Sequence, residues 1–248
     1  DHCFADAPAR SSAVRAFVTG ADEWRNLEEW PLATSQVELH LATDPATDPG
    51  TGPATGGAAG RTTGRLVSGS DDAGQTTFVF DPADPTPALG GRTTDPSESG
   101  AKDNRPLAAR SDVVSFTGDA LPDPMEICGN PELELRLAVT NPHSDVFVRL
   151  CDVDPKGRVV NIADAFVRLD PSAPTEHRQL VRLTLDPCWH RIVAGHRLQL
   201  LIAGGAHPRF ARNLGTPGPV ADGSALEVQP HTIHHRDTTL RLPVVAGG

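Results

Sequence analysis

The chain has 248 residues, enough for one large all-β domain or two smaller ones, and 32 acidic and 22 basic residues give it a formal net charge of −10. A nucleic-acid-binding protein needs a basic face to neutralise phosphates, so this balance argues against a nucleic-acid partner. No run of 18 apolar residues is present, and the sequence predicts no membrane span. The 23 Gly and 23 Pro residues interrupt short runs of Val, Leu and Thr, which favours strands over helices.

The first half of the chain alternates expected strands with polar connections. We expect strands at residues 13–19, 37–41, 65–67 and 76–80. Residues 43–60 are poor in apolar groups and rich in Asp, Pro, Thr, Gly and Ala, which predicts a mobile surface loop. A Pro-rich turn, DPADPTP, closes on Gly90-Gly91, and residues 92–111 form a connection of a length typical of functional or disordered segments.

The second half has denser β patterning. Residues 132–139 (ELELRLAV) alternate apolar and charged side chains, as a strand with one buried face does. Further strands are expected at residues 146–153, 158–162, 180–185, 198–203 and 239–244. The segment DPKG at 154–157 predicts a hairpin turn. About ten short strands with irregular connections predict an all-β fold, a two-layer antiparallel sandwich of the jelly-roll type. An immunoglobulin-like sandwich is the alternative, but the Cys…Trp…Cys pattern is absent.

The four cysteines, Cys3, Cys128, Cys151 and Cys188, match no metal-binding spacing such as Cys-x-x-Cys, so we expect no zinc site and no cofactor. Reduced, buried thiols are the preferred interpretation. A Cys128–Cys151 disulfide is the alternative, since both residues lie in strands expected to be neighbours. The segment at 152–157 begins like a calcium loop, but its twelfth position is Ala163 instead of Glu.

Hydrolase and metal chemistry have weak support in the residues. A nucleophilic serine needs a Gly-x-Ser-x-Gly elbow, and the nearest segment, SGSD at 68–71, lacks the flanking glycines and the following helix. We therefore expect no complete triad in this chain and no activity of the chain alone. His231, His234 and His235 lie near Asp237, but on a strand His234 points away from the other two. They are expected to be exposed histidines and not a metal site.

Two segments carry candidate binding residues. Arg209 and Arg212 in PRFARN suit either a ligand carboxylate or a contact with a neighbouring domain. The mixed apolar and charged character of the segment favours the domain contact. Trp24 and Trp30 suit stacking on a sugar, but tryptophans of this kind more often cover the edge of a core.

Six segments, in this order along the chain, resemble a family of serine hydrolases. They are residues 14–31 (VRAFVTGADEWRNLEEWP), 80–91 (FDPADPTPALGG), 103–116 (DNRPLAARSDVVSF), 153–164 (VDPKGRVVNIAD), 190–213 (HRIVAGHRLQLLIAGGAHPRFARN) and 240–244 (LRLPV). Each is similar to a stretch of the C-terminal β-domain of hydrolases of the cocaine esterase, α-amino acid ester hydrolase and X-prolyl dipeptidyl peptidase type. The resemblance covers nearly the whole chain.

The resemblance implies a parent enzyme with an α/β-hydrolase domain, a helical cap and this jelly roll, which would be galactose-binding-domain-like. Its Ser, Asp and His triad would lie N-terminal to Asp1, and His2 lacks the Gly-Pro-Trp surroundings of the family's triad histidine. We expect residues 1–12 to be the tail of the α/β-hydrolase domain and residues 13–248 to be the C-terminal β-domain. The chain begins without an initiator Met or a signal peptide, as a fragment or processed product does. Its location is left open, with the cytoplasm preferred to secretion.

In the family, the β-domain packs against the other domains and helps to wall the substrate pocket, partly through the loop after the Gly-Gly turn. In this chain that loop, residues 92–104, is polar, which disfavours aromatic ester substrates. The residues expected to face the pocket or to dock the catalytic domain are Arg92, Thr93, Asn104, Arg105, Arg209, Phe210, Arg212 and Asn213.

The expected function is that of a non-catalytic β-domain of an esterase or X-Pro dipeptidyl peptidase. Its expected partner is the α/β-hydrolase domain of the same protein, and association between copies is left open. A stand-alone carbohydrate-binding jelly roll and a structural β-sandwich without a ligand are the alternatives.

Overall fold

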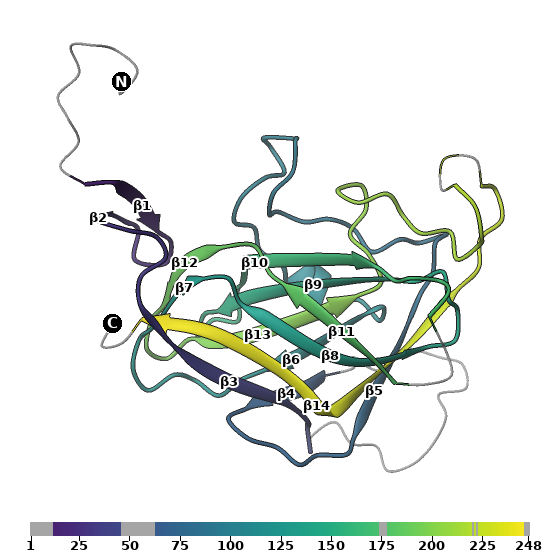
Figure 1. Cartoon of the computed structure of the whole chain (residues 1–248), viewed down its shortest axis with the longest axis horizontal. Helices are drawn as coiled ribbons and strands as arrows, with labels where there is room; N and C mark the ends of the chain where they lie inside the picture. The colour runs from purple at the N-terminus through teal and green to yellow at the C-terminus, as the bar shows by residue number, and fades with distance from the viewer. Residues whose placement is uncertain (1–11, 46–62, 174–177, 220, 222, 246–248) are drawn as a thin grey trace.

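The computed structural model describes residues 12–45, 63–173, 178–219, 221 and 223–245, which form a β-sandwich with a two-stranded hairpin outside it (Figure 1). The elements in chain order are β1 (Val14–Val18), β2 (Glu23–Leu27), β3 (Thr34–Thr43), β4 (Thr63–Val67), β5 (Gln75–Phe80), α1 (Arg105–Ala108), β6 (Val113–Thr117), β7 (Met125–Gly129), β8 (Glu132–Val139), β9 (Asp145–Val153), β10 (Val159–Arg168), β11 (Gln179–Thr184), β12 (Cys188–Ile192), β13 (Arg197–Ala203) and β14 (Gln229–Val245). No helix in the described ranges combines the length and the apolar character needed to cross a membrane.

Two layers of strands face each other. One layer follows the order β10-β9-β13-β6, and the other is built around β14, which pairs with β3, β5, β7 and β8. The strands β3 and β4 join the layers, because β4 pairs with β3 on one side and with β6 on the other. The β4–β6 pair is parallel and the other strand pairs of the described residues are antiparallel. The predicted all-β, jelly-roll-like sandwich is confirmed.

The space between the layers is filled by aliphatic side chains. In β8 the apolar positions are buried and the intervening polar ones are more exposed, as the alternation in the sequence predicts. The inner face of β13 contributes residues that are at most 3% exposed, namely Leu198, Leu200 and Ile202. The DPKG segment forms the predicted turn between β9 and β10, where Gly157 adopts a φ of 82°.

A second apolar cluster lies on the outer face of β9 and β13. Phe147, Cys151 and Leu201 pack there against Leu107 of α1 and against Ala206, which follows β13. As a result β9 is buried at every position along its length. Part of the connection at residues 92–111, expected to be functional or disordered, is therefore ordered as a cover for this face.

Three strands, β2, β6 and β12, are absent from the expectations based on sequence, whereas β7 contains Cys128, which was expected to lie in a strand. The three absent strands are five residues each, and two of them, β2 (EWRNL) and β12 (CWHRI), lack clean alternation. The last strand is also longer than expected: β14 runs through 17 residues, with a change of register between His234 and Thr239. Asp237 adopts a φ of 64° in this interval.

The histidines of β14 are buried, and the prediction that they are exposed is wrong. His231, His234 and His235 are 1%, 8% and 2% exposed. The ring of His231 stacks on Phe78 with 4.5 Å between ring centroids, and His235 meets another ring edge-on. Burial lowers the pKa of His231 and of His234. Because β14 lies at the centre of its layer, polar side chains on it reach the interior.

The cysteines of the described residues are free thiols. Cys128 packs with Val18 and Trp189, whereas Cys151 belongs to the cluster on the outer face of β9. The disulfide alternative is therefore wrong and the reduced, buried interpretation is confirmed for these two residues. Burial raises the pKa of the Cys188 thiol to about 12. Cys3 and most of the loop expected at 43–60 lie outside the described residues, and Thr43 itself ends β3.

Candidate functional site

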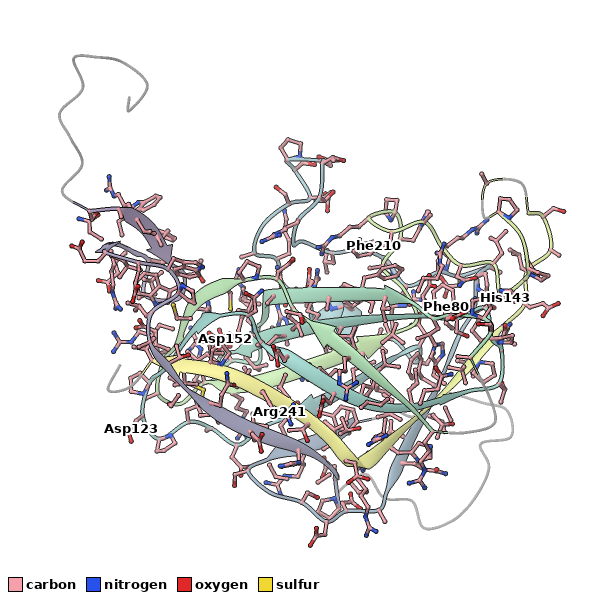
Figure 2. All side chains as sticks on the ribbon, viewed as in Figure 1. Phe80, Asp123, His143, Asp152, Phe210 and Arg241 are labelled. Atoms are coloured by element: carbon pink, nitrogen blue, oxygen red, sulfur yellow. The ribbon has the colours of Figure 1, made fainter. Side chains whose placement is uncertain are left out.

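A cleft of about 700 Å³ opens beside the β1–β2 hairpin. Its walls are Phe17 and the hairpin turn on one side and the loop at residues 91–101 on the other, and β10 forms part of its lining. Figure 2 places Asp152, another lining residue, on the side of the sandwich from which the hairpin projects. The cleft combines apolar and charged lining groups, as binding surfaces for small molecules and for protein segments do.

A chain of alternating charges runs from the interior to the rim of this cleft. Arg149 on β9 and Asp164 on β10 are cross-strand neighbours and form two hydrogen bonds of 2.7 and 2.8 Å. Arg209 contacts Asp164 as well and lies 3.5 Å from a carboxylate oxygen of Asp186. Asp186 in turn pairs with Arg92 at 3.1 Å. The exposed fraction of the side chain rises from 0% at Arg149 to 65% at Arg92.

Arg149, at the buried end of this chain, has a raised pKa. Burial alone would lower the pKa of Arg149, but the hydrogen bonds and the negative charge of Asp164 outweigh it and raise that pKa above its ordinary value. A buried guanidinium with a bidentate carboxylate partner has most of its desolvation cost offset, whereas removal of one partner would leave a charge without compensation. This pair is therefore a fixed part of the fold.

A second polar cluster links the hairpin to the sandwich. The Thr19 hydroxyl lies 2.8 Å from Nδ1 of His190, whose Nε2 lies 3.1 Å from Asp152. The other oxygen of Asp152 lies 2.8 Å from Nδ1 of His196. Backbone hydrogen bonds from Thr19 to Trp189 and from Arg191 to Thr19 add to this link. The cluster thus fixes the turn of the hairpin on β12.

The groups Thr19, His190 and Asp152 have the order of a hydrolase triad, namely hydroxyl, imidazole and carboxylate. The imidazole presents Nδ1 to the hydroxyl, whereas a Ser-His-Asp triad uses Nε2 there. The hydroxyl also lies 3.0 Å from the Trp189 carbonyl oxygen, within the link between hairpin and sandwich. We interpret the cluster as a structural latch.

The hairpin itself is only partly covered. Phe17 and Trp24 are 40% and 59% exposed and pack against each other with their ring centroids 5.3 Å apart. Arg25 connects β2 to the sandwich through a hydrogen bond of 2.6 Å to the buried carboxylate of Glu126. A two-stranded hairpin is marginally stable by itself, and exposed aromatic side chains that lie together are a common feature of interaction surfaces.

The residues predicted to face a pocket or to dock a domain fall into two groups, those at the cleft or its loop and those held by other contacts within the chain. Arg92 lines the cleft, and Arg209 and Asn104 join it through the charge chain, since Arg149 donates a hydrogen bond of 2.6 Å to Asn104. Thr93 lies in the same loop, half-buried, and Arg105 is exposed and paired with Asp103.

The remaining predicted residues have partners within the chain. The ring of Phe210 stacks on Phe166 with 4.1 Å between centroids. Arg212 donates a hydrogen bond to the Pro82 carbonyl oxygen. Asn213 is buried and donates a hydrogen bond of 2.8 Å to Asp145. These contacts hold the PRFARN segment against the sandwich.

Several residues of the cleft and its charge chain, including Arg149, Asp152 and His190, were not among the predicted site residues. For Arg149 a signal was available: it lies between Phe147 and Cys151 on one face of β9, in the middle of the run VFVRLC, whose other residues are apolar. A charged residue at such a position needs a buried partner. His190 and His196 carried no such signal, because their hydrogen-bond partners come from distant segments of the chain. Within the described ranges, no three His, Cys, Asp or Glu side chains are arranged to hold a metal ion.

The fold and this cleft define an all-β, jelly-roll-like domain with a partly covered hairpin at its N-terminal side. The family described as the X-Pro dipeptidyl-peptidase C-terminal non-catalytic domain matches residues 6–241, and the chain belongs to this family. The resemblance identified in the sequence is therefore confirmed.

Relatives with longer chains are similar to this one. The cocaine esterase of Rhodococcus sp. (strain MB1 Bresler) is 32% identical over 225 residues, which cover 87% of this chain and 38% of that protein. The structure of an α-amino acid ester hydrolase matches with a TM-score of 0.73 at 22% identity, covering 93% of this chain and 41% of its own. An aminopeptidase from the marine sediment archaeon Thaumarchaeota archaeon matches with a TM-score of 0.75 at 20% identity, covering 97% and 42%. The two structures support the fold, and the chain spans about two-fifths of the length of these relatives.

Proposed function

We propose that this chain works as the C-terminal β-domain of a serine hydrolase that acts on esters or on peptides with proline at the second position. In this proposal the acyl-transfer chemistry belongs to an α/β-hydrolase domain that carries the nucleophile and the oxyanion hole. The β-domain stabilises that domain and contributes the loop at residues 91–103 to the wall of the substrate pocket. The family membership and the likeness to ester hydrolases support this assignment.

The observation that carries the proposal is the exposed hairpin beside the cleft. Phe17 and Trp24 leave aromatic surface uncovered at the N-terminal side of a chain that matches only 38% of its esterase relative. The same hairpin borders the cleft, whose opposite wall is the proposed pocket loop. A catalytic domain that covers the hairpin would thus also contact the loop at residues 91–103.

The test uses the catalytic segment of the longer hydrolase, produced with and without this chain. We expect this chain alone to show no turnover of p-nitrophenyl esters or of Gly-Pro-p-nitroanilide, and we expect activity when the two parts are combined. Turnover by this chain alone, abolished by a serine-directed phosphonate, would overturn the proposal.

The docking surface is tested with matched substitutions. Phe17→Ser and Trp24→Ser are expected to weaken the association of the two parts by about tenfold each, because each removes buried aromatic area. Val79→Ser and Val228→Ser remove exposed apolar groups outside the cleft lining and serve as controls. Equal effects of the two pairs would place the interface elsewhere.

Carbohydrate binding is the second candidate, favoured by the exposure of Trp24. One face of its ring is already partnered, since the Arg15 guanidinium lies 5.0 Å from the ring centroid. Trp30 is 38% exposed and packs against Trp189. Glycan-array binding that is lost in Trp24→Ala and Trp30→Ala would favour this function over the docking role.

A further inference from the structure

We infer that Arg149 is the positioning residue of the loop at residues 91–103, and that its guanidinium sets the loop's place in the substrate-pocket wall. The inference rests on the proposed function, which assigns this loop to the pocket. The carrying observation is that a single buried side chain holds both ends of the loop.

The first end of the loop is held through backbone carbonyl groups. Nη1 of Arg149 donates a hydrogen bond to the carbonyl oxygen of Leu89, and Nη2 donates a longer one of 3.4 Å to that of Gly90. The loop begins at Gly91, whose backbone passes close to the guanidinium group of Arg149. A Cβ atom at Gly91 would lie 2.9 Å from Nη2 of Arg149 and 2.5 Å from Oδ2 of Asp164. The chain approaches the charge pair this closely because the residue is glycine.

The second end is held through Asn104. Nη1 of Arg149 donates a hydrogen bond of 2.6 Å to Oδ1 of Asn104, which is fully buried. The amide group of Asn104 donates to the Lys102 carbonyl oxygen and to Oδ1 of Asn161, at 2.9 and 3.1 Å. Asn161 in turn donates a hydrogen bond of 3.1 Å to Gly100. Through this series of hydrogen bonds, Arg149 holds the second half of the loop in place.

Between these ends the loop has little packing of its own. Residues 94–98 are exposed, and their hydrogen bonds are local, such as those between Asp95 and Ser97. Gly91 and Gly100 form a short backbone pair at the base, with hydrogen bonds of 2.7 and 2.9 Å. A loop held only at its base takes its direction from the base.

The chemistry of the site calls for arginine. Arg149 donates hydrogen bonds from both sides of its guanidinium group. Nε and Nη2 donate to Asp164, and Nη1 donates to Leu89 and Asn104. A lysine ammonium group would neutralise Asp164 but lacks the planar fork that serves both sets of acceptors. Arg149→Lys therefore keeps the charge and removes the link to the loop.

The same pair of strands provides a matched control. Further along the same pairing of β9 with β10, Arg168 lies opposite Asp145 and forms two hydrogen bonds of 2.9 Å with it. Arg168 also donates a hydrogen bond to the Ala211 carbonyl oxygen, which lies outside the loop at residues 91–103. Arg168→Lys thus alters a second bidentate Arg–Asp pair between the same two strands, one whose arginine is more exposed, without touching the loop.

The experiment measures kcat and KM of the full-length hydrolase for p-nitrophenyl esters with a short and a long acyl chain. Arg149→Lys is expected to change the ratio of the two kcat/KM values by about tenfold, mainly through KM. Asn104→Ala leaves the Arg149–Asp164 pair intact, is expected to act in the same direction, and decides the case if Arg149→Lys fails to fold. Arg168→Lys is expected to leave the ratio within about twofold. Hydrogen exchange at residues 91–103 is expected to accelerate in the first two variants only.

A fourth variant, with residues 93–99 replaced by two glycines, separates the two hypotheses. If this excision leaves the ratio unchanged, the loop does not wall the pocket, and both the proposed role and the inference are overturned. If the excision changes the ratio while Arg149→Lys and Asn104→Ala behave like Arg168→Lys, the inference is overturned and the proposed function stands.

Discussion

The carboxylate of Asp72 joins its own loop to the end of β3 and to the part of β14 where the register changes. It accepts hydrogen bonds from the backbone and hydroxyl of Thr43 at 2.5 and 2.8 Å, from Gly74 at 2.8 Å, and lies 3.0 Å from Nδ1 of His235. Burial alone would raise the pKa of Asp72, but the hydrogen bonds with His235, Thr43 and Gly74 outweigh it and hold that pKa well below its usual range.

Asp72→Asn is expected to lower the free energy of unfolding by about 1–3 kcal/mol at pH 7, because charge-assisted bonds are lost. A carboxylate whose pKa is lower in the folded state stabilises fully above its unfolded pKa of about 3.9, and this contribution disappears as the pH falls below that value. Urea unfolding at several pH values should therefore show a gap between the two proteins that narrows below about pH 4. Asp123→Asn, at an exposed position, serves as the control. A gap that stays constant to pH 2 would contradict this assignment.

A comparison of substitutions at Gly91 and Gly157 separates the cost of crowding against the Arg149–Asp164 pair from the cost of backbone strain. Both have positive φ values, 77° and 82°, but a Cβ at Gly157 would meet no atom within 4 Å. Gly157→Ala is expected to cost about 1–2 kcal/mol from the left-handed conformation alone. Gly91→Ala should cost about 1–3 kcal/mol more, since its Cβ would collide with Asp164. Thermal unfolding of the two variants checks this, and equal losses would show that the loop moves aside freely.

At the scale of elements, the strands that follow a simple pattern are those the sequence predicted. β8 alternates between core and solvent, and β9 and β10 flank a turn of standard composition, so all three are recognisable. β2 and β12 are short and mixed in polarity, and only part of β12, with Ile192, belongs to the main core. Their polar residues, such as Arg25 and His190, pair with partners from distant parts of the chain. Such pairing follows from tertiary structure, which local periodicity does not contain.

The candidate site was predictable to the same limited extent. Its family resemblance pointed to the loop after Gly91 and to the PRFARN segment, and Arg92 and Arg209 do belong to one charge chain. The buried centre of that chain, Arg149 with Asp164, was overlooked because charged residues are usually read as surface groups. His231 and His235 are likewise polar residues in the interior, where hydrogen bonds and ring stacking accommodate them, so the expectation that they are exposed is wrong.

The latch at Thr19 predicts that the β1–β2 hairpin is a separate unit of stability. His190→Ala removes the ring that joins Thr19 to Asp152 and is expected to speed amide exchange in β1 and β2 about fivefold, which corresponds to one lost hydrogen bond. The effect is partial because the Arg25–Glu126 bond remains. Exchange in β8 and β13 should be unchanged. His143→Ala, on a connection between β8 and β9, is the matched control, and equal exchange in both variants would contradict a latch at His190.

On the scale of the whole molecule, the last strand completes the fold. β14 pairs with β8 and β5 through its first half and with β3, β8 and β7 through its second half. It therefore joins strands from the beginning and the middle of the sequence, and Leu240 and Leu242 are fully buried in the core. A layer without its central strand would leave several strand edges unpaired and the core open.

A chain truncated after residue 228 is therefore expected to lack a cooperative unfolding transition and to expose apolar surface that binds a hydrophobic dye. A chain truncated after residue 245 retains β14 and should unfold as the whole chain does. Because β14 supplies the pairing that the other strands of its layer lack in the shorter chain, a synthetic peptide of residues 229–245 should restore a cooperative transition to that chain when added in excess. Circular dichroism during urea unfolding measures all three cases. A cooperative transition in the shorter chain without the peptide would show that the layer around β14 is not required for the fold.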